Sequence, residues 1–177
     1  MVCLAEVSPQ SFSWGATIII SGLYSCAAKP NPSALTEYFL SAYNIDKSKV
    51  YAEGYSGGGE TMSLVMGMRP DLYTAYLQWS SQWDGANEPV VQAKTPVYFV
   101  VGAHDEYYGS EPSEDAYNNL RELYQQEGLS DEEIDDLLVL DVKDDSYFSD
   151  QGVTNQHGQG GGLFVEDDVV MGWLLGK

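Results

Sequence analysis

The sequence predicts an α/β fold in which a mostly parallel β-sheet is flanked by helices. Short apolar runs typical of buried strands alternate with segments whose apolar residues recur at helical spacing. The clearest strand, TPVYFVVG at 95–102, is almost wholly apolar, as expected for a strand that is covered on both faces of a parallel sheet. The 177 residues contain no internal repeat and no linker that would divide them. One domain over residues 1–177 is therefore expected.

Each element follows from a local pattern. Apolar or alternating runs predict strands at 2–7, within 16–28, and at 49–54, 74–79, 95–102 and 137–142. Helical spacing with terminal signals predicts helices at 33–44, 60–68, 113–128 and 164–175, the last packing Val165, Val169 and Trp173 inward. Ser130 and Glu133 form a capping-box pattern before a further short helix. The polar, glycine-rich segment 143–162 is expected to be a loop.

Composition and charge exclude several classes of function. The formal net charge is −19, from 27 Asp and Glu against 8 Lys and Arg, which opposes binding to a phosphate backbone. Nucleic acid is therefore not an expected partner. No apolar run reaches the roughly 18 residues that a membrane-spanning helix needs, so no membrane partner is expected either.

Two cysteines, Cys3 and Cys26, are too few for a disulfide framework and lack the paired spacing of a zinc site. Cys26 ends a run, residues 23–26, that fits a lipoprotein signal, but Glu6 stands where such a signal is basic. A core strand is the preferred interpretation of this region. The cytoplasm is the default location, and secretion or lipid anchoring stays open.

The sequence GYSGG at 54–58 matches the nucleophile elbow, GxSxG, in which a serine occupies a sharp turn between a strand and a helix. The required context is present, because a predicted strand precedes the motif and a predicted helix follows it. Ser56 is thus the candidate nucleophile. Gly57, the residue after it, is the candidate donor of one oxyanion hydrogen bond through its backbone N–H.

A serine nucleophile needs a base and an acid, and enzymes with this elbow supply them in the chain order serine, acid, histidine. Asp105 follows the strand at 95–102, where ligand-facing residues of parallel sheets emerge, and Glu106 is its rival. His157 is one of only two histidines and comes after the last predicted strand. The predicted triad is therefore Ser56, Asp105 and His157.

The predicted chemistry is ester hydrolysis without a metal or other cofactor. Ser56 attacks the carbonyl carbon, His157 accepts its proton, Asp105 stabilises the imidazolium, and water releases the acyl group. His104 has no ligand cluster beside it that would indicate a metal. Aromatic residues near the site mouth are candidates to bind a small-molecule ester, although core or lid packing is the preferred interpretation: Tyr55, Trp79, Trp83 and Tyr107, with Tyr108 next to Tyr107.

Three segments carry a resemblance to a known superfamily. The run from Tyr43 to Tyr73, with its elbow, resembles the nucleophile region of α/β-hydrolase serine esterases related to polyhydroxybutyrate depolymerase, feruloyl esterase and the prolyl oligopeptidase group. TPVYFVVGAHDEYY resembles their acid segment, and NQHG with the final WLL resembles their histidine segment. The resemblance implies an α/β-hydrolase fold and carboxyl-ester hydrolysis.

The start of the chain departs from that pattern, because only 55 residues precede Ser56. We expect a partial α/β-hydrolase fold that lacks its N-terminal strands and the loop that donates the second oxyanion hydrogen bond. The bare sheet edge would then favour a homo-oligomer or another partner chain. Two alternatives stay open: a noncatalytic or degenerate domain that acts as a binding or assembly scaffold, and a serine peptidase of the same fold.

Overall fold

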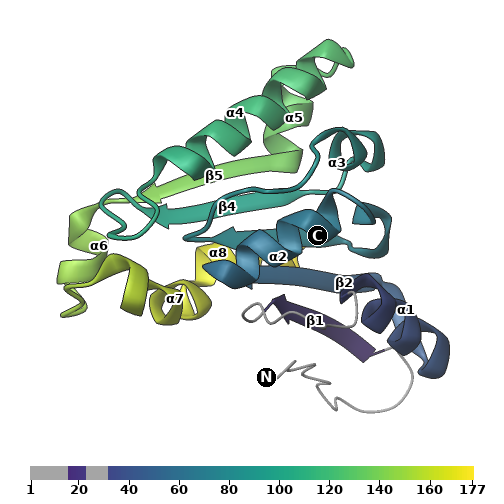
Figure 1. Cartoon of the computed structure of the whole chain (residues 1–177), viewed down its shortest axis with the longest axis horizontal. Helices are drawn as coiled ribbons and strands as arrows, with labels where there is room; N and C mark the ends of the chain where they lie inside the picture. Colours follow the sequence, from purple (N-terminus) through teal and green to yellow (C-terminus); the bar gives the residue numbers. More distant parts are fainter. Residues whose placement is uncertain (1–15, 23–31) are drawn as a thin grey trace.

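The computed structural model describes residues 16–22 and 32–177. Within these residues, five strands form one fully parallel sheet in the order β1-β2-β3-β4-β5 (Figure 1). The strands are β1 (Ala16–Gly22), β2 (Ile45–Tyr55), β3 (Ala75–Trp79), β4 (Val97–Gly102) and β5 (Leu138–Lys143).

Helices cover both faces of the sheet. One face carries α1 (Pro32–Ala42), α2 (Gly57–Met66), α3 (Glu88–Ala93), α4 (Glu111–Gln126) and α5 (Asp131–Leu137). The other carries α6 (Asp145–Ser149), α7 (Gln156–Glu166) and α8 (Asp168–Leu175). A short 3₁₀ turn, η1 (Pro70–Leu72), precedes β3. The molecule is thus built in three layers.

The connections explain this division. Strands that follow one another in the sequence are also neighbours in the sheet, and right-handed crossovers between them must then all lie on the same face. The helices between β1 and β5 therefore share one face. The opposite face is left to the three helices that follow β5.

Alternating side chains divide the core between the two faces. Val50 and Ala52 of β2 pack under α2, whereas Tyr51 between them points to the other side. In β4, Phe99 packs on the α2 side of the sheet and Tyr98 on the other side. Because β3 and β4 are buried over their whole length, the near-continuous apolar runs in the sequence are accounted for.

The predicted strands within 16–28 and at 49–54, 74–79, 95–102 and 137–142 are confirmed as β1 to β5. The capping box is also confirmed: the Ser130 hydroxyl accepts a hydrogen bond from Glu133 N–H, and the Glu133 carboxylate accepts one from Ser130 N–H. The predicted strand at 2–7 lies outside the described residues. No helix in the described ranges is both long and apolar enough to cross a membrane.

Two predictions about the C-terminal part were wrong. The segment 143–162 is not a loop, since it contains α6 and most of α7. The predicted helix at 164–175 is interrupted at Asp167, whose side chain accepts hydrogen bonds from the first N–H groups of α8. This break changes the helical phase, so Val165 and Val169 are exposed while Val170 and Leu174 are buried.

Candidate active site

Ser56 occupies a strained turn between β2 and α2. Its φ of 53° and ψ of −130° are unfavourable for a residue with a side chain, and the turn needs close backbone contact. A Cβ at Gly54 would lie 2.6 Å from the Cα of Gly59, and one at Gly59 would lie 2.5 Å from the side chain of Ser81. Glycine at both positions therefore lets α2 start directly against the strand. The Ser81 hydroxyl fastens the turn by donating to the Ser56 carbonyl at 2.6 Å.

The structure brings Ser56, His157 and Asp105 into one hydrogen-bonded chain. Ser56 Oγ lies 3.0 Å from His157 Nε2, and His157 Nδ1 lies 2.9 Å from Asp105 Oδ2. The three residues follow β2, β5 and β4, respectively, so they meet at the carboxyl edge of the parallel sheet. The Asp105 carboxylate is fully buried, and the imidazole retains a small exposed edge.

Asp105 is fixed by the turn that follows it. Its Oδ1 accepts hydrogen bonds from the backbone N–H groups of Tyr107 and Tyr108 at 3.0 and 2.9 Å. These bonds satisfy a buried carboxylate that would otherwise be costly. They also aim its Oδ2 at the imidazole.

Glu106, the rival acid, contacts the backbone of α7 rather than the imidazole. Its two carboxylate oxygens accept hydrogen bonds from Gln156 N–H at 3.0 Å and His157 N–H at 2.8 Å. The bond from His157 N–H is the main reason that the pKa of Glu106 lies below its usual range. Of the two candidate acids, only Asp105 contacts the imidazole ring.

Aromatic rings surround the imidazole. Tyr55 and Tyr107 stack on it at centroid distances of 5.6 and 5.2 Å, and Tyr108 meets it edge-on at 5.4 Å. Tyr107 is 73% exposed, so its ring forms part of the outer wall of the site. These rings limit the access of water to the hydrogen bonds of His157.

Glu60 is a site residue that the sequence interpretation missed, whereas Tyr108 was expected only as an aromatic residue near the site mouth. The Tyr108 hydroxyl donates a 2.7 Å hydrogen bond to Glu60 in the first turn of α2. Burial and this carboxylate raise the pKa of the Tyr108 phenol. The only sequence signal for Glu60 was its position four residues after Ser56, while Tyr108 stands three residues after Asp105.

The oxyanion region is described in part. Gly57 provides the first N–H of α2, at the positive end of the helix dipole, and this N–H has no hydrogen-bond partner among the described residues. Gly22 at the end of β1 pairs with Gly54 at the elbow. The segment after it, 23–31, lies outside the described residues, so the expected lack of a second donor loop stays a prediction.

Comparisons with known proteins agree with this architecture. The model of the prolyl oligopeptidase family matches residues 32–84, which include the elbow. Among solved structures, a thermostable esterase is similar over 80% of this chain, with 19% identity and a TM-score of 0.62. The chain has the α/β-hydrolase fold. It is a serine-hydrolase-fold protein, similar both to esterases and to prolyl oligopeptidase-type hydrolases.

Other similar structures cover less of this α/β-hydrolase chain. Est1E from Butyrivibrio proteoclasticus matches 64% of it, with 16% identity and a TM-score of 0.46. Oligopeptidase B from Leishmania major also matches 64%, with 18% identity and a TM-score of 0.45. The chain spans 34% of the thermostable esterase, 57% of Est1E and 20% of the oligopeptidase. No curated protein sequence gives a significant match.

The two tryptophans predicted near the site of this hydrolase fold differ in position. Trp79 is buried, and its indole packs against Phe164 on the α7 side of the sheet. Trp83 lies on the opposite face, where its ring contacts Tyr76 and Phe99 and also lines a hollow of about 470 Å³ beside the start of α4. Trp79 therefore acts in core packing, whereas Trp83 has a face toward open space.

His104 pairs with Asp145 and not with the residues of the triad. Its Nδ1 lies 2.7 Å from Asp145, which also accepts a 2.8 Å hydrogen bond from the Gln156 amide. The hydrogen bond with Asp145 raises the pKa of His104. Among the described residues, no group of three or more His, Cys, Asp or Glu side chains could hold a metal ion.

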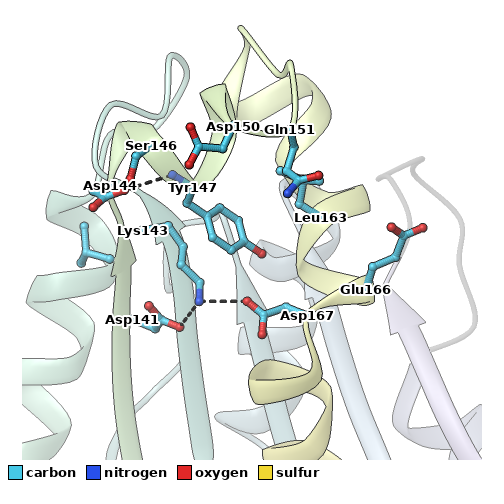
Figure 2. Close-up of a pocket in the computed structure, with 11 residues that line it drawn as sticks. Asp141, Lys143, Asp144, Ser146, Tyr147, Asp150, Gln151, Leu163, Glu166 and Asp167 are labelled. Atoms are coloured by element: carbon cyan, nitrogen blue, oxygen red, sulfur yellow. Dashed lines mark hydrogen bonds and ion pairs between the residues drawn. The ribbon is translucent and has the colours of Figure 1, made fainter.

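A second hollow, of about 650 Å³, lies between the end of β5, α6 and the α7–α8 junction (Figure 2). Figure 2 shows Lys143 in it, paired with Asp141 at 2.8 Å and Asp167 at 3.0 Å. The ammonium group also lies over the ring of Tyr147. These contacts join β5 to the start of α8 and contain none of the predicted site residues.

Proposed function

We propose that this chain is a serine hydrolase that cleaves carboxylic esters. The observation that carries the proposal is the continuous hydrogen-bonded chain from Ser56 Oγ through His157 to the buried Asp105 carboxylate. This arrangement is the one that serine acyl-transfer chemistry requires. The elbow around Ser56 supports it, because a strained backbone at this position is typical of the nucleophile in α/β-hydrolases.

The reaction proceeds in two half-reactions. Ser56 Oγ attacks the ester carbonyl carbon while its proton passes to His157 Nε2, and the tetrahedral intermediate then collapses as that proton passes to the departing alkoxide. Water next attacks the acyl-enzyme, giving one proton to His157 and releasing the acid as Ser56 regains a proton. Asp105 stabilises the imidazolium in both halves.

Different residues stabilise the oxyanion of the transition state and contact the rest of the substrate. Gly57 N–H donates to the carbonyl oxygen as it becomes negative. Tyr55 and Tyr107, beside His157, form an aromatic wall for the acyl or alcohol group. Trp83, which lines the hollow beside the start of α4, is a further candidate contact because Ser81, two residues before it, holds the elbow. Trp79 is left out of the substrate site because it is buried in the core.

A peptidase of the same mechanism is the second candidate, favoured by the match of residues 32–84 to the prolyl oligopeptidase family. Parallel assays with p-nitrophenyl acetate and with p-nitroanilide peptides separate the two. We expect turnover of the ester, loss of that turnover in Ser56→Ala, and unchanged turnover in Ser41→Ala, whose exposed serine lies on α1. Faster cleavage of the peptides would replace the ester proposal by the peptidase.

The noncatalytic scaffold is the remaining alternative. β1 is the outermost described strand on its side of the sheet, and pairing of another chain with that edge would be its mode of assembly. The scaffold predicts a folded dimer without serine reactivity. A folded wild-type protein that hydrolyses neither substrate would favour it over the enzyme.

A further inference from the structure

The helix that carries His157 has little intrinsic stability. Four of the 11 residues of α7 are glycines, and glycine in a helix interior is destabilising relative to alanine. His157 is the second residue of this helix, where fraying begins. The position of the base therefore depends on contacts outside the helix itself.

Those contacts converge on the first turn of α7. Glu106 accepts from the N–H groups of Gln156 and His157, and the Asn155 side chain accepts from Gly158 N–H. The Asn155 N–H donates to the side-chain oxygen of Gln159 at 3.4 Å. All four N–H groups that a helix leaves unpaired at its start are thus satisfied. Of these contacts, only those of Glu106 come from the distant loop that also carries Asp105.

We propose that Glu106 is a positioning residue that fixes the first turn of α7 and so sets the distance between His157 and both Ser56 and Asp105. The inference rests on the proposed function. Asp105 holds the imidazole by its side chain, while Glu106, the next residue, holds the same histidine by its backbone. Two adjacent carboxylates on one loop therefore hold the imidazole ring of His157 and its backbone N–H, respectively.

The electrostatics support the assignment. A carboxylate at a helix N-terminus is stabilised by the helix dipole and by the N–H groups it accepts from. The lowered pKa of Glu106 agrees with this, although Asp105 beside it acts in the opposite direction. Glu106 is exposed, so its effect is expected to be moderate: a roughly tenfold change in rate, which corresponds to about 1.4 kcal/mol.

The test compares Glu106→Gln and Glu106→Asp with Glu166→Gln, a matched control at the far end of α7 where no side-chain hydrogen bond is lost among the described residues. For Glu106→Gln we expect kcat on p-nitrophenyl acetate to fall about tenfold, with KM changed less than about twofold. Glu106→Asp should recover part of that loss because it keeps the charge. Glu166→Gln should behave like the wild type.

Hydrogen exchange provides a readout that does not depend on activity. In Glu106→Gln, the amides of Gln156 and His157 should exchange faster, whereas those of α4 should not change. The proposal is overturned if these two amides keep their wild-type protection, or if kcat falls only in proportion to the fraction of protein that is unfolded. A wild-type protein without serine reactivity would instead overturn the proposed function, and the exchange comparison would still decide whether Glu106 holds α7.

Discussion

Two glycine-rich segments carry the two reacting side chains of this fold, and their glycines serve different purposes. In residues 54–59, Gly54 and Gly59 are required because a Cβ at either would lie within 3 Å of backbone atoms. In residues 158–162, beside His157, a Cβ would meet only side-chain atoms at Gly158, Gly160 and Gly161, and nothing within 4 Å at Gly162. The nucleophile is therefore held by the backbone, whereas the base is held by side chains that reach α7 from other elements.

The largest effect is expected at the elbow. In Gly54→Ala the new Cβ would lie 2.6 Å from Gly59 Cα, and backbone atoms cannot yield as a side chain can. The free energy of unfolding should fall by on the order of 3 kcal/mol, and hydrolysis should be lost as Ser56 moves. Urea unfolding and the p-nitrophenyl acetate assay measure both. Gly172→Ala, where nothing lies within 4 Å, is the control, and equal stability of the two variants would contradict the account.

A smaller effect with two signs is expected within α7. Gly160→Ala places a Cβ 3.0 Å from the ring of Phe148 and should lower the free energy of unfolding by about 1 to 2 kcal/mol. Gly162→Ala meets no atom within 4 Å and should raise it by up to about 1 kcal/mol through helix propensity. Chemical denaturation of both variants checks the pair. The same sign for both would refute the contrast between crowded and open positions.

The smallest effect concerns pH. The pKa of Glu106 is lowered in the folded state, chiefly by the hydrogen bond from His157 N–H, so its stabilising contribution is complete above the pKa of an unfolded glutamate. It is lost as the pH falls through the lower, folded value. The difference in Tm between wild type and Glu106→Gln should therefore shrink below the usual glutamate range. A difference that grows on acidification would contradict the assigned contacts.

The sequence was informative where a function imposes a pattern. The elbow motif, its flanking strand and helix, and the chain order of serine, acid and histidine identified the three residues that the structure brings together. Buried strands were also predictable, because a sheet covered on both faces requires apolar runs. These signals are local in the chain.

Long-range packing explains what was missed. Glycine propensity argued for a loop around His157, but the side chain of Glu106, 50 residues before Gln156, accepts hydrogen bonds from the first N–H groups of that segment, which forms α7. Trp79 of β3 packs against Phe164 of α7. No local sequence pattern reveals that contact. Val165 and Val169 were assigned inward because the break at Asp167, and with it the change of helical phase, was not anticipated.

The central claim is that Ser56 is an activated nucleophile, and labelling with a fluorophosphonate probe tests it most directly. The folded wild-type protein should gain one probe adduct, mapped by peptide mass spectrometry to Ser56, and His157→Ala should lose it because the serine then lacks its base. Ser41→Ala should be labelled like the wild type. No adduct on Ser56 in folded wild-type protein, or equal labelling in His157→Ala, would contradict the account.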